Sequence, residues 1–75
     1  MKFTKWLKNT YKGSNTPEED LLNDIESDKE FPKLNSKMAI LQHLENSHAC
    51  SNCIRTFIRA WYEYKAENEL EKMGY

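Results

Sequence analysis

Apolar and aromatic side chains recur every three or four residues along most of this 75-residue chain, and that period is the period of an α-helix. The pattern is clearest toward the C-terminus, where one helix face would carry Cys50, Cys53, Ile54, Phe57, Trp61 and Tyr64. Strands need alternating runs rich in β-branched residues, and the chain contains no valine. The sequence therefore predicts an all-α fold.

The first two of four predicted helices have distinct ends. One covers about residues 2–12 and stops at Gly13, because glycine can adopt the left-handed conformation that ends a helix. The next begins at Thr16 as a capping box, in which the Thr16 hydroxyl accepts the Glu19 N–H and the Glu19 carboxylate reaches back. It is expected to end at 31–32, since a residue before proline avoids helical geometry.

The third helix is expected to start at Ser36 and the fourth to cover about residues 47–72. With a rise of about 1.5 Å per residue, the fourth helix would be about 40 Å long. Three shorter helices would then pack against it, and its last turns would extend beyond them. We expect one domain over residues 1–75, with its core in 3–64 and a C-terminal helical extension in 65–75.

Charge and cysteine content restrict the class of protein. Eleven Lys and Arg residues oppose twelve Asp and Glu residues, whereas nucleic-acid-binding domains are commonly basic. No apolar run approaches the roughly 18 residues of a membrane span. Two cysteines three positions apart are a poor disulfide framework for a chain of this size. We expect a reduced, cytoplasmic protein that does not enter a membrane.

Several short motifs follow one another in order through residues 3–64. They are Phe3-x-x-Trp6-Leu7, Thr16-Pro17-x-x-Asp20-Leu21, Asp24-Ile25-x-x-Asp28 before Phe31-Pro32, Ile40 with Leu44, and Phe57-x-x-Ala60-Trp61-x-x-Tyr64. The series resembles the YozE-like family of short bacterial proteins. That resemblance implies a compact four-helix bundle likened to the sterile alpha motif (SAM-like), and no assigned activity. The chain departs from the family pattern at Lys37, where an acidic residue is typical, and in having Cys50 and Cys53.

Most of the residues that carry this resemblance are expected to pack inside the protein, because large apolar side chains at helical spacing form cores. The predicted core consists of Phe3, Trp6, Leu7, Leu21, Leu22, Ile25, Phe31, Pro32, Ile40, Leu44, Phe57, Trp61 and Tyr64.

Metal binding is a weak possibility for the histidines and cysteines. His43, His48, Cys50 and Cys53 have the chemistry of zinc ligands, but a zinc finger separates its two ligand pairs by a dozen or so residues. The cysteines lie in phase with Ile54 and Phe57, so small buried thiols are the favoured interpretation. A thioredoxin-like redox role is expected even less, because no βαβ pattern surrounds them.

Catalysis is not indicated either. Asp20, Asp24 and Asp28 would share one helix face, which is more typical of a solvated acidic surface than of paired catalytic carboxylates. The chain has no glycine-rich phosphate loop, and a bundle of this size rarely encloses a cleft. We therefore expect a protein that is not an enzyme and needs no cofactor.

Charge segregation is the feature that bears on function. Residues 1–12 carry four lysines and no acid, whereas residues 18–30 carry seven acids and one lysine. A protein-interaction or accessory module using charged patches is the favoured hypothesis, as a monomer or with weak head-to-tail self-association. The alternative is a nucleic-acid-binding module. In both hypotheses the candidate binding residues are Lys2, Lys5, Lys8, Lys12, Arg55 and Arg59.

Overall fold

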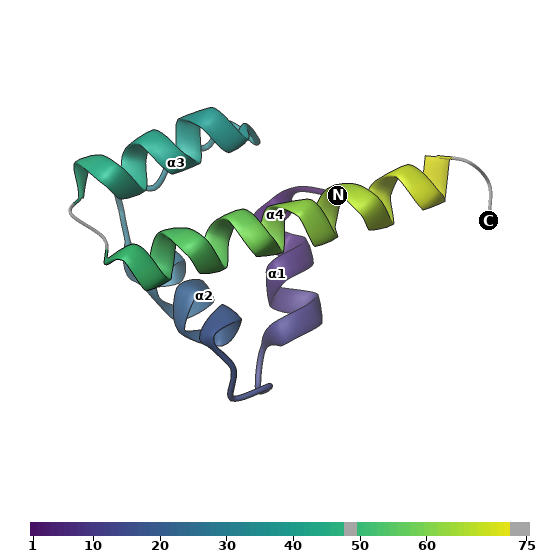
Figure 1. The fold of residues 1–75 in the computed structure, drawn as a ribbon, viewed down its shortest axis with the longest axis horizontal. Helices are drawn as coiled ribbons and strands as arrows, with labels where there is room; N and C mark the ends of the chain where they lie inside the picture. Colours follow the sequence, from purple (N-terminus) through teal and green to yellow (C-terminus); the bar gives the residue numbers. More distant parts are fainter. Residues whose placement is uncertain (48–49, 73–75) are drawn as a thin grey trace.

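The computed structural model describes residues 1–47 and 50–72, with the side chains of 1–47 and 50–69. Its elements are α1 (Phe3–Tyr11), α2 (Pro17–Ser27), α3 (Lys37–Asn46) and α4 (Ser51–Lys72). The α4 helix contacts each of the other three, with α1 and α2 on one side of it and α3 on the other (Figure 1). The last turns of α4 extend past its neighbours (Figure 1). The all-α prediction with a long C-terminal helix is confirmed.

The core is centred on the ring of Phe3, which is fully buried. Its centroid lies 5.5 Å from that of Phe57, in an edge-to-face contact that suits aromatic rings, and 5.2 Å from that of Trp61, whose ring is tilted by 42°. The predicted core residues are all buried except Phe31 and Pro32, which are half-buried. They lie in the connection between α2 and α3. Ala60, which was not predicted, is also buried.

Two predicted helix boundaries are confirmed. The α1 helix is followed by Gly13 with φ of 80°, the left-handed conformation that glycine adopts without strain. The α3 helix is preceded by Ser36, whose hydroxyl oxygen accepts a hydrogen bond from the Ala39 N–H at 3.3 Å.

The capping box predicted at Thr16 is wrong in its hydrogen bonds, although α2 does begin at Pro17. The Thr16 hydroxyl is paired with that of Ser14 at 2.7 Å instead of capping the helix. The Glu19 carboxylate reaches back past Thr16 and accepts the N–H groups of Gly13 at 2.5 Å and Asn15 at 2.9 Å. Because Gly13 and Asn15 have positive φ, their N–H groups turn toward α2, and Glu19 fixes the whole connection between the helices.

The predicted end of α2 at Phe31–Pro32 is also wrong, because the helix stops at Ser27. Asp28 has extended backbone angles, and its Oδ1 accepts the Glu30 N–H at 2.9 Å. A side chain that bonds the backbone two residues on offers a turn in place of another helical turn.

The start of α4 differs from the predicted residue 47. Ser47 instead ends α3, because its N–H donates to the His43 carbonyl oxygen at 2.9 Å. The first residue of α4 is Ser51, and Cys50 precedes it with a carbonyl oxygen that accepts the Ile54 N–H at 3.1 Å.

The long connection between α2 and α3 is hydrogen-bonded to the start of α1 and to α4. Asn35 Oδ1 accepts the Phe3 N–H at 2.9 Å, and its Nδ2 donates to the Tyr64 hydroxyl at 2.8 Å. The Tyr64 hydroxyl in turn donates to the carbonyl oxygen of Met1. One amide side chain therefore fixes the start of α1 against the middle of α4.

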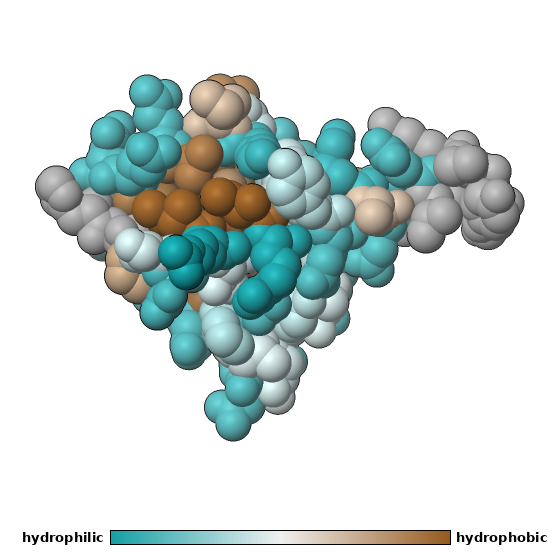
Figure 2. Space-filling view, viewed as in Figure 1, coloured by the Kyte–Doolittle hydropathy of each residue, from teal (hydrophilic) through white to brown (hydrophobic). Residues whose placement is uncertain are grey.

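Apolar side chains also reach the surface. On the face shown in Figure 2 they gather between α3 and α4, and the half-buried apolar residues of those helices include Leu41, Ile54 and Ile58. Within the described residues, no helix combines the length and apolar character needed to span a membrane.

Candidate functional site

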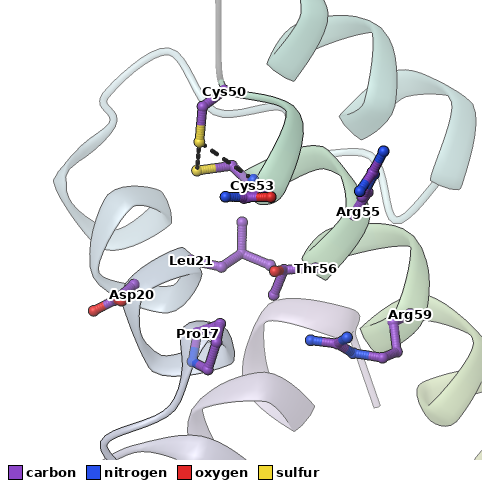
Figure 3. Close-up of a pocket in the computed structure, with 9 residues that line it drawn as sticks. Pro17, Asp20, Leu21, Cys50, Cys53, Arg55, Thr56 and Arg59 are labelled. Atoms are coloured by element: carbon purple, nitrogen blue, oxygen red, sulfur yellow. Dashed lines mark hydrogen bonds between the residues drawn. The ribbon is translucent and has the colours of Figure 1, made fainter.

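A groove of about 550 Å³ lies between the first turns of α2 and the first half of α4 (Figure 3). It is lined by Pro17, Asp20, Leu21, Cys50, Asn52, Cys53, Arg55, Thr56 and Arg59. Leu21 and Thr56 are buried and face each other across its floor (Figure 3), whereas Asp20, Arg55 and Arg59 are exposed around it. The groove therefore combines a floor of one apolar and one hydroxyl side chain with a charged rim.

The spacing of residues on the two helices explains how the groove is built. On α4, Asn52, Thr56 and Arg59 recur every three or four residues and so share one helix face. On α2, Pro17 and Leu21 are likewise one turn apart. The groove forms where these two faces meet.

Arg59 forms the lower end of the groove and is held by α2. It reaches from α4 toward the start of α2 (Figure 3), and its Nε lies 3.6 Å from Oε2 of Glu18. Glu18, one of the seven acids in residues 18–30, is only 7% exposed. A buried carboxylate needs a partner charge, so part of the charge of Arg59 is already balanced inside the protein.

Arg55 differs from Arg59 in this respect. Its side chain is exposed on the outer rim of the groove, and it forms no ion pair with any residue that the structure describes. Arg55 is therefore the groove cation most available to a ligand.

The lysines of the predicted binding surface are separate from the groove. Lys2, Lys5, Lys8 and Lys12 are exposed, and none of them lines it. Lys8 is directed toward α2, where its Nζ lies 3.9 Å from Oε2 of Glu26. The six predicted cationic residues thus divide into a pair at the groove and a separate set on and beside α1.

The acidic helix is less free than the sequence predicted. Glu18 pairs with Arg59, Glu26 with Lys8, and Glu19 holds the preceding loop. Asp20 and Asp24 are exposed, as a solvated face requires, but Asp28 is half-buried and lies beyond the end of the helix. Two of the seven acids in residues 18–30 therefore pair with a lysine or arginine, and Glu19 is bound to backbone N–H groups.

The candidate metal ligands are not gathered into one site by the described residues. His43 Nε2 lies 2.6 Å from Oδ2 of Asp28, and its ring packs edge-on against Phe31. His48 lies outside the described residues. Among the residues that are described, no group of three or more His, Cys, Asp or Glu side chains could hold a metal ion.

The expectation that both cysteines are buried is wrong. Cys50 is exposed and Cys53 is half-buried, at the upper end of the groove (Figure 3). Cys50 precedes the first turn of α4 and so does not share the buried face of that helix. Its Sγ accepts the Cys53 N–H at 3.4 Å and lies 2.9 Å from Cys53 Sγ.

Comparison with protein families supplies the identification. The model of the YozE SAM-like fold matches residues 3–66, which is most of the chain. The chain belongs to the YozE SAM-like family. Searches of curated proteins and of solved structures give no match.

In this member of the YozE SAM-like family, Lys37 donates a hydrogen bond to the Tyr62 hydroxyl at 3.3 Å, and its ammonium group lies 4.7 Å from the Tyr62 ring centroid.

Sequence reasoning missed several residues of the groove. The predicted binding residues include neither Pro17 on α2 nor Asn52 and Thr56 on α4. A signal was present, because Asn52, Thr56 and Arg59 form a polar stripe along one face of the predicted helix. The spacing of residues in the sequence does not show which neighbouring helix faces that stripe.

Proposed function

We propose that this protein of the YozE SAM-like family is a non-enzymatic protein-interaction module whose α2–α4 groove binds an acidic segment of a partner protein. The observation that carries the proposal is the groove itself, in which a floor formed by Leu21 and Thr56 lies below the exposed cation of Arg55.

The two parts of the groove suit a peptide with mixed chemistry. The Leu21 side chain and the methyl group of Thr56 favour a partner side chain that leaves water on binding. Arginine presents several donors in a planar group that matches a carboxylate, so Arg55 would select and orient an acidic residue. Complementary charge also speeds the encounter of the partners.

The distribution of charge favours a protein partner over a nucleic acid. A nucleic acid presents a regular row of phosphates and is bound by cations that follow it. Here the lysines of α1 do not line the groove, and the carboxylate of Asp20 stands on the wall opposite Arg55 (Figure 3). Asp20 would repel a phosphate row but leaves room for one acidic side chain.

The groove is expected to take a different protein more readily than a second copy of this chain. Head-to-tail association would require the acids of α2 to bind the groove cations of the next molecule. Three acids of α2, Glu18, Glu19 and Glu26, already have partners within the chain, which leaves Asp20 and Asp24 as its exposed acids for such a contact. Self-association should therefore be weak.

The proposal is tested by selecting peptides from a displayed random library on the immobilised protein and measuring the binding of the enriched peptide by fluorescence anisotropy. We expect enriched sequences in which an acidic residue lies close to an apolar one. Arg55→Glu should weaken binding at least about tenfold, because a hydrogen bond to a charged group contributes about 1.5–3 kcal/mol.

Lys5→Glu is the matched control, since it makes the same change of charge at an exposed position outside the groove. Its affinity should stay close to that of the unchanged protein. Equal losses in both variants, or enriched peptides without acidic residues, would contradict the proposal. Salt-sensitive binding of a labelled DNA duplex or single strand that Lys5→Glu abolishes would replace it with the nucleic-acid hypothesis.

A further inference from the structure

The two cysteines at the upper end of the groove have a geometry that packing does not require. Their Sγ atoms are 2.9 Å apart, closer than two unbonded sulfur atoms normally approach. A disulfide bond is about 2.05 Å long, so closing one between them needs only a small movement of the side chains. The pair is also at the surface, because Cys50 is exposed.

The backbone around Cys50 stabilises a negative charge on its sulfur. Cys50 lies immediately before α4, and its Sγ accepts the N–H of Cys53 in the first turn of that helix. The unpaired N–H groups and the dipole at a helix start both favour an anion. Hydrogen bonds from Cys53, first from its thiol and then from its backbone N–H, lower the pKa of Cys50.

Cys53 has the complementary properties of a second thiol. Its hydrogen bond to Cys50, its partial burial and the negative charges of Cys50 and Asp24 raise its pKa. Among the residues that the structure describes, Asp20 on α2 and Arg55 on α4 are charged groups that also line the groove. The Cys50 thiol therefore loses its proton more readily than the Cys53 thiol, and the Cys53 sulfur lies within reach of the Cys50 sulfur.

We propose that Cys50 and Cys53 form a dithiol site that exchanges with the disulfide of an oxidised low-molecular-weight thiol, with Cys50 attacking first and Cys53 resolving the product. The sequence argued against a thioredoxin-like redox role because no βαβ pattern surrounds the two cysteines. Thiol–disulfide exchange requires an accessible thiolate and a second thiol within bonding reach, and the start of α4 supplies both.

The exchange has two steps. The Cys50 thiolate attacks one sulfur of the disulfide RS–SR, forming a Cys50–SR mixed disulfide and releasing RS⁻. Cys53 then loses its proton to that thiolate or to solvent and attacks the Cys50 sulfur, forming the Cys50–Cys53 disulfide and releasing the second RS⁻. The protein dithiol is oxidised by two electrons, and RS–SR is reduced to two thiols. The reaction modifies the protein once and is compatible with a binding function.

The reduced protein is incubated with glutathione disulfide at neutral pH, and the products are separated by mass. We expect the unchanged protein to lose two hydrogen atoms, with little glutathione adduct. Cys53→Ser should accumulate the glutathione adduct on Cys50, because no resolving thiol is present. The rate of reaction of Cys50→Ser should be at most about one fifth of that of the unchanged protein, because Cys53 is less exposed and less ionised.

A second measurement uses the unchanged chain alone and does not depend on the folding of a variant. Limiting iodoacetamide followed by peptide mapping identifies the thiol that reacts first, and Cys50 should be labelled preferentially until urea unfolds the protein. A persistent glutathione adduct on the unchanged protein, or equal labelling of both cysteines in the folded chain, would overturn the proposal. Neither readout involves a peptide partner, so this result is independent of the binding function.

Discussion

Oδ2 of Asp28 lies 2.6 Å from Nε2 of His43 and joins the residue that ends α2 to the last turn of α3. The contact connects α3 with the other side of the bundle, since α3 otherwise packs on α4 within the described chain. The His43 hydrogen bond is the main reason why the pKa of Asp28 is lowered, and the Glu30 N–H adds to it.

The Asp28–His43 contact predicts a loss of stability in acid. A carboxyl group whose pKa is lower in the folded chain stabilises the fold above its ordinary pKa of about 4. That stabilisation is lost as the pH falls through the lowered pKa of Asp28. Urea unfolding at a series of pH values should therefore show a steeper acid loss for the unchanged protein than for Asp28→Asn. Parallel curves for the two proteins would refute the prediction.

A second pH effect is expected at Tyr11, whose hydroxyl donates to Oε2 of Glu63 at 2.5 Å. This hydrogen bond is the main cause, and burial the second cause, that raises the pKa of Tyr11 to about 12. The raised pKa stabilises the fold below the ordinary tyrosine pKa of about 10, and the contribution is lost as the pH rises through about 12.

The absorbance of phenolate, measured as the difference between the unchanged protein and Tyr11→Phe, isolates this titration. In Glu63→Gln the carboxylate is lost, and the Tyr11 titration should move down toward about 10. An unchanged titration in Glu63→Gln would show that the contact with Glu63 is not the cause.

The pairing of Glu18 with Arg59 predicts non-additive effects on stability. Removing the cation in Arg59→Ala leaves a carboxylate buried without its partner, and we expect a loss of about 1–2 kcal/mol because the arginine end is exposed to solvent. Changing Glu18 to Gln in the same chain should recover much of that loss. Losses that simply add in the double variant would mean that the two residues do not interact.

The aromatic core predicts the largest loss of stability. Phe57 is fully buried and its ring contacts those of Phe3 and Trp61, so Phe57→Ala should cost about 3–5 kcal/mol. Such a loss consumes most of the stability of a small domain. Tyr62→Ala removes an exposed aromatic ring from the same helix and should cost less than about 1 kcal/mol. Circular dichroism during urea unfolding measures the free energy of unfolding of both variants. Equal losses would contradict the assignment of Phe57 to the core.

Helical periodicity was sufficient to predict most of the fold. Phe3, Trp6, Phe57 and Trp61 could be assigned to the core because burial of large apolar side chains at this spacing outweighs most local effects. The end of α2 could not, because Asp28 forms a turn through its own side chain and a distant histidine then holds it.

The candidate site was predicted less well than the fold. Arg55 and Arg59 were identified from charge, but sequence spacing could not show that Glu18 would be buried beside Arg59 or that α2 would form the opposite wall of the groove. Cys50 was misplaced for a related reason. A residue just before a helix has the spacing of the helix face without lying on it, and the predicted start of α4 came several residues too early.

Residue-by-residue NMR shifts of the amide groups, recorded while the enriched acidic peptide is added, test the central claim most directly. The account predicts that the shifted amides cluster on the two walls of the groove, over residues 18–21 of α2 and 52–59 of α4. Shifts concentrated on the lysine-bearing α1 helix, with the groove amides unmoved, would contradict it.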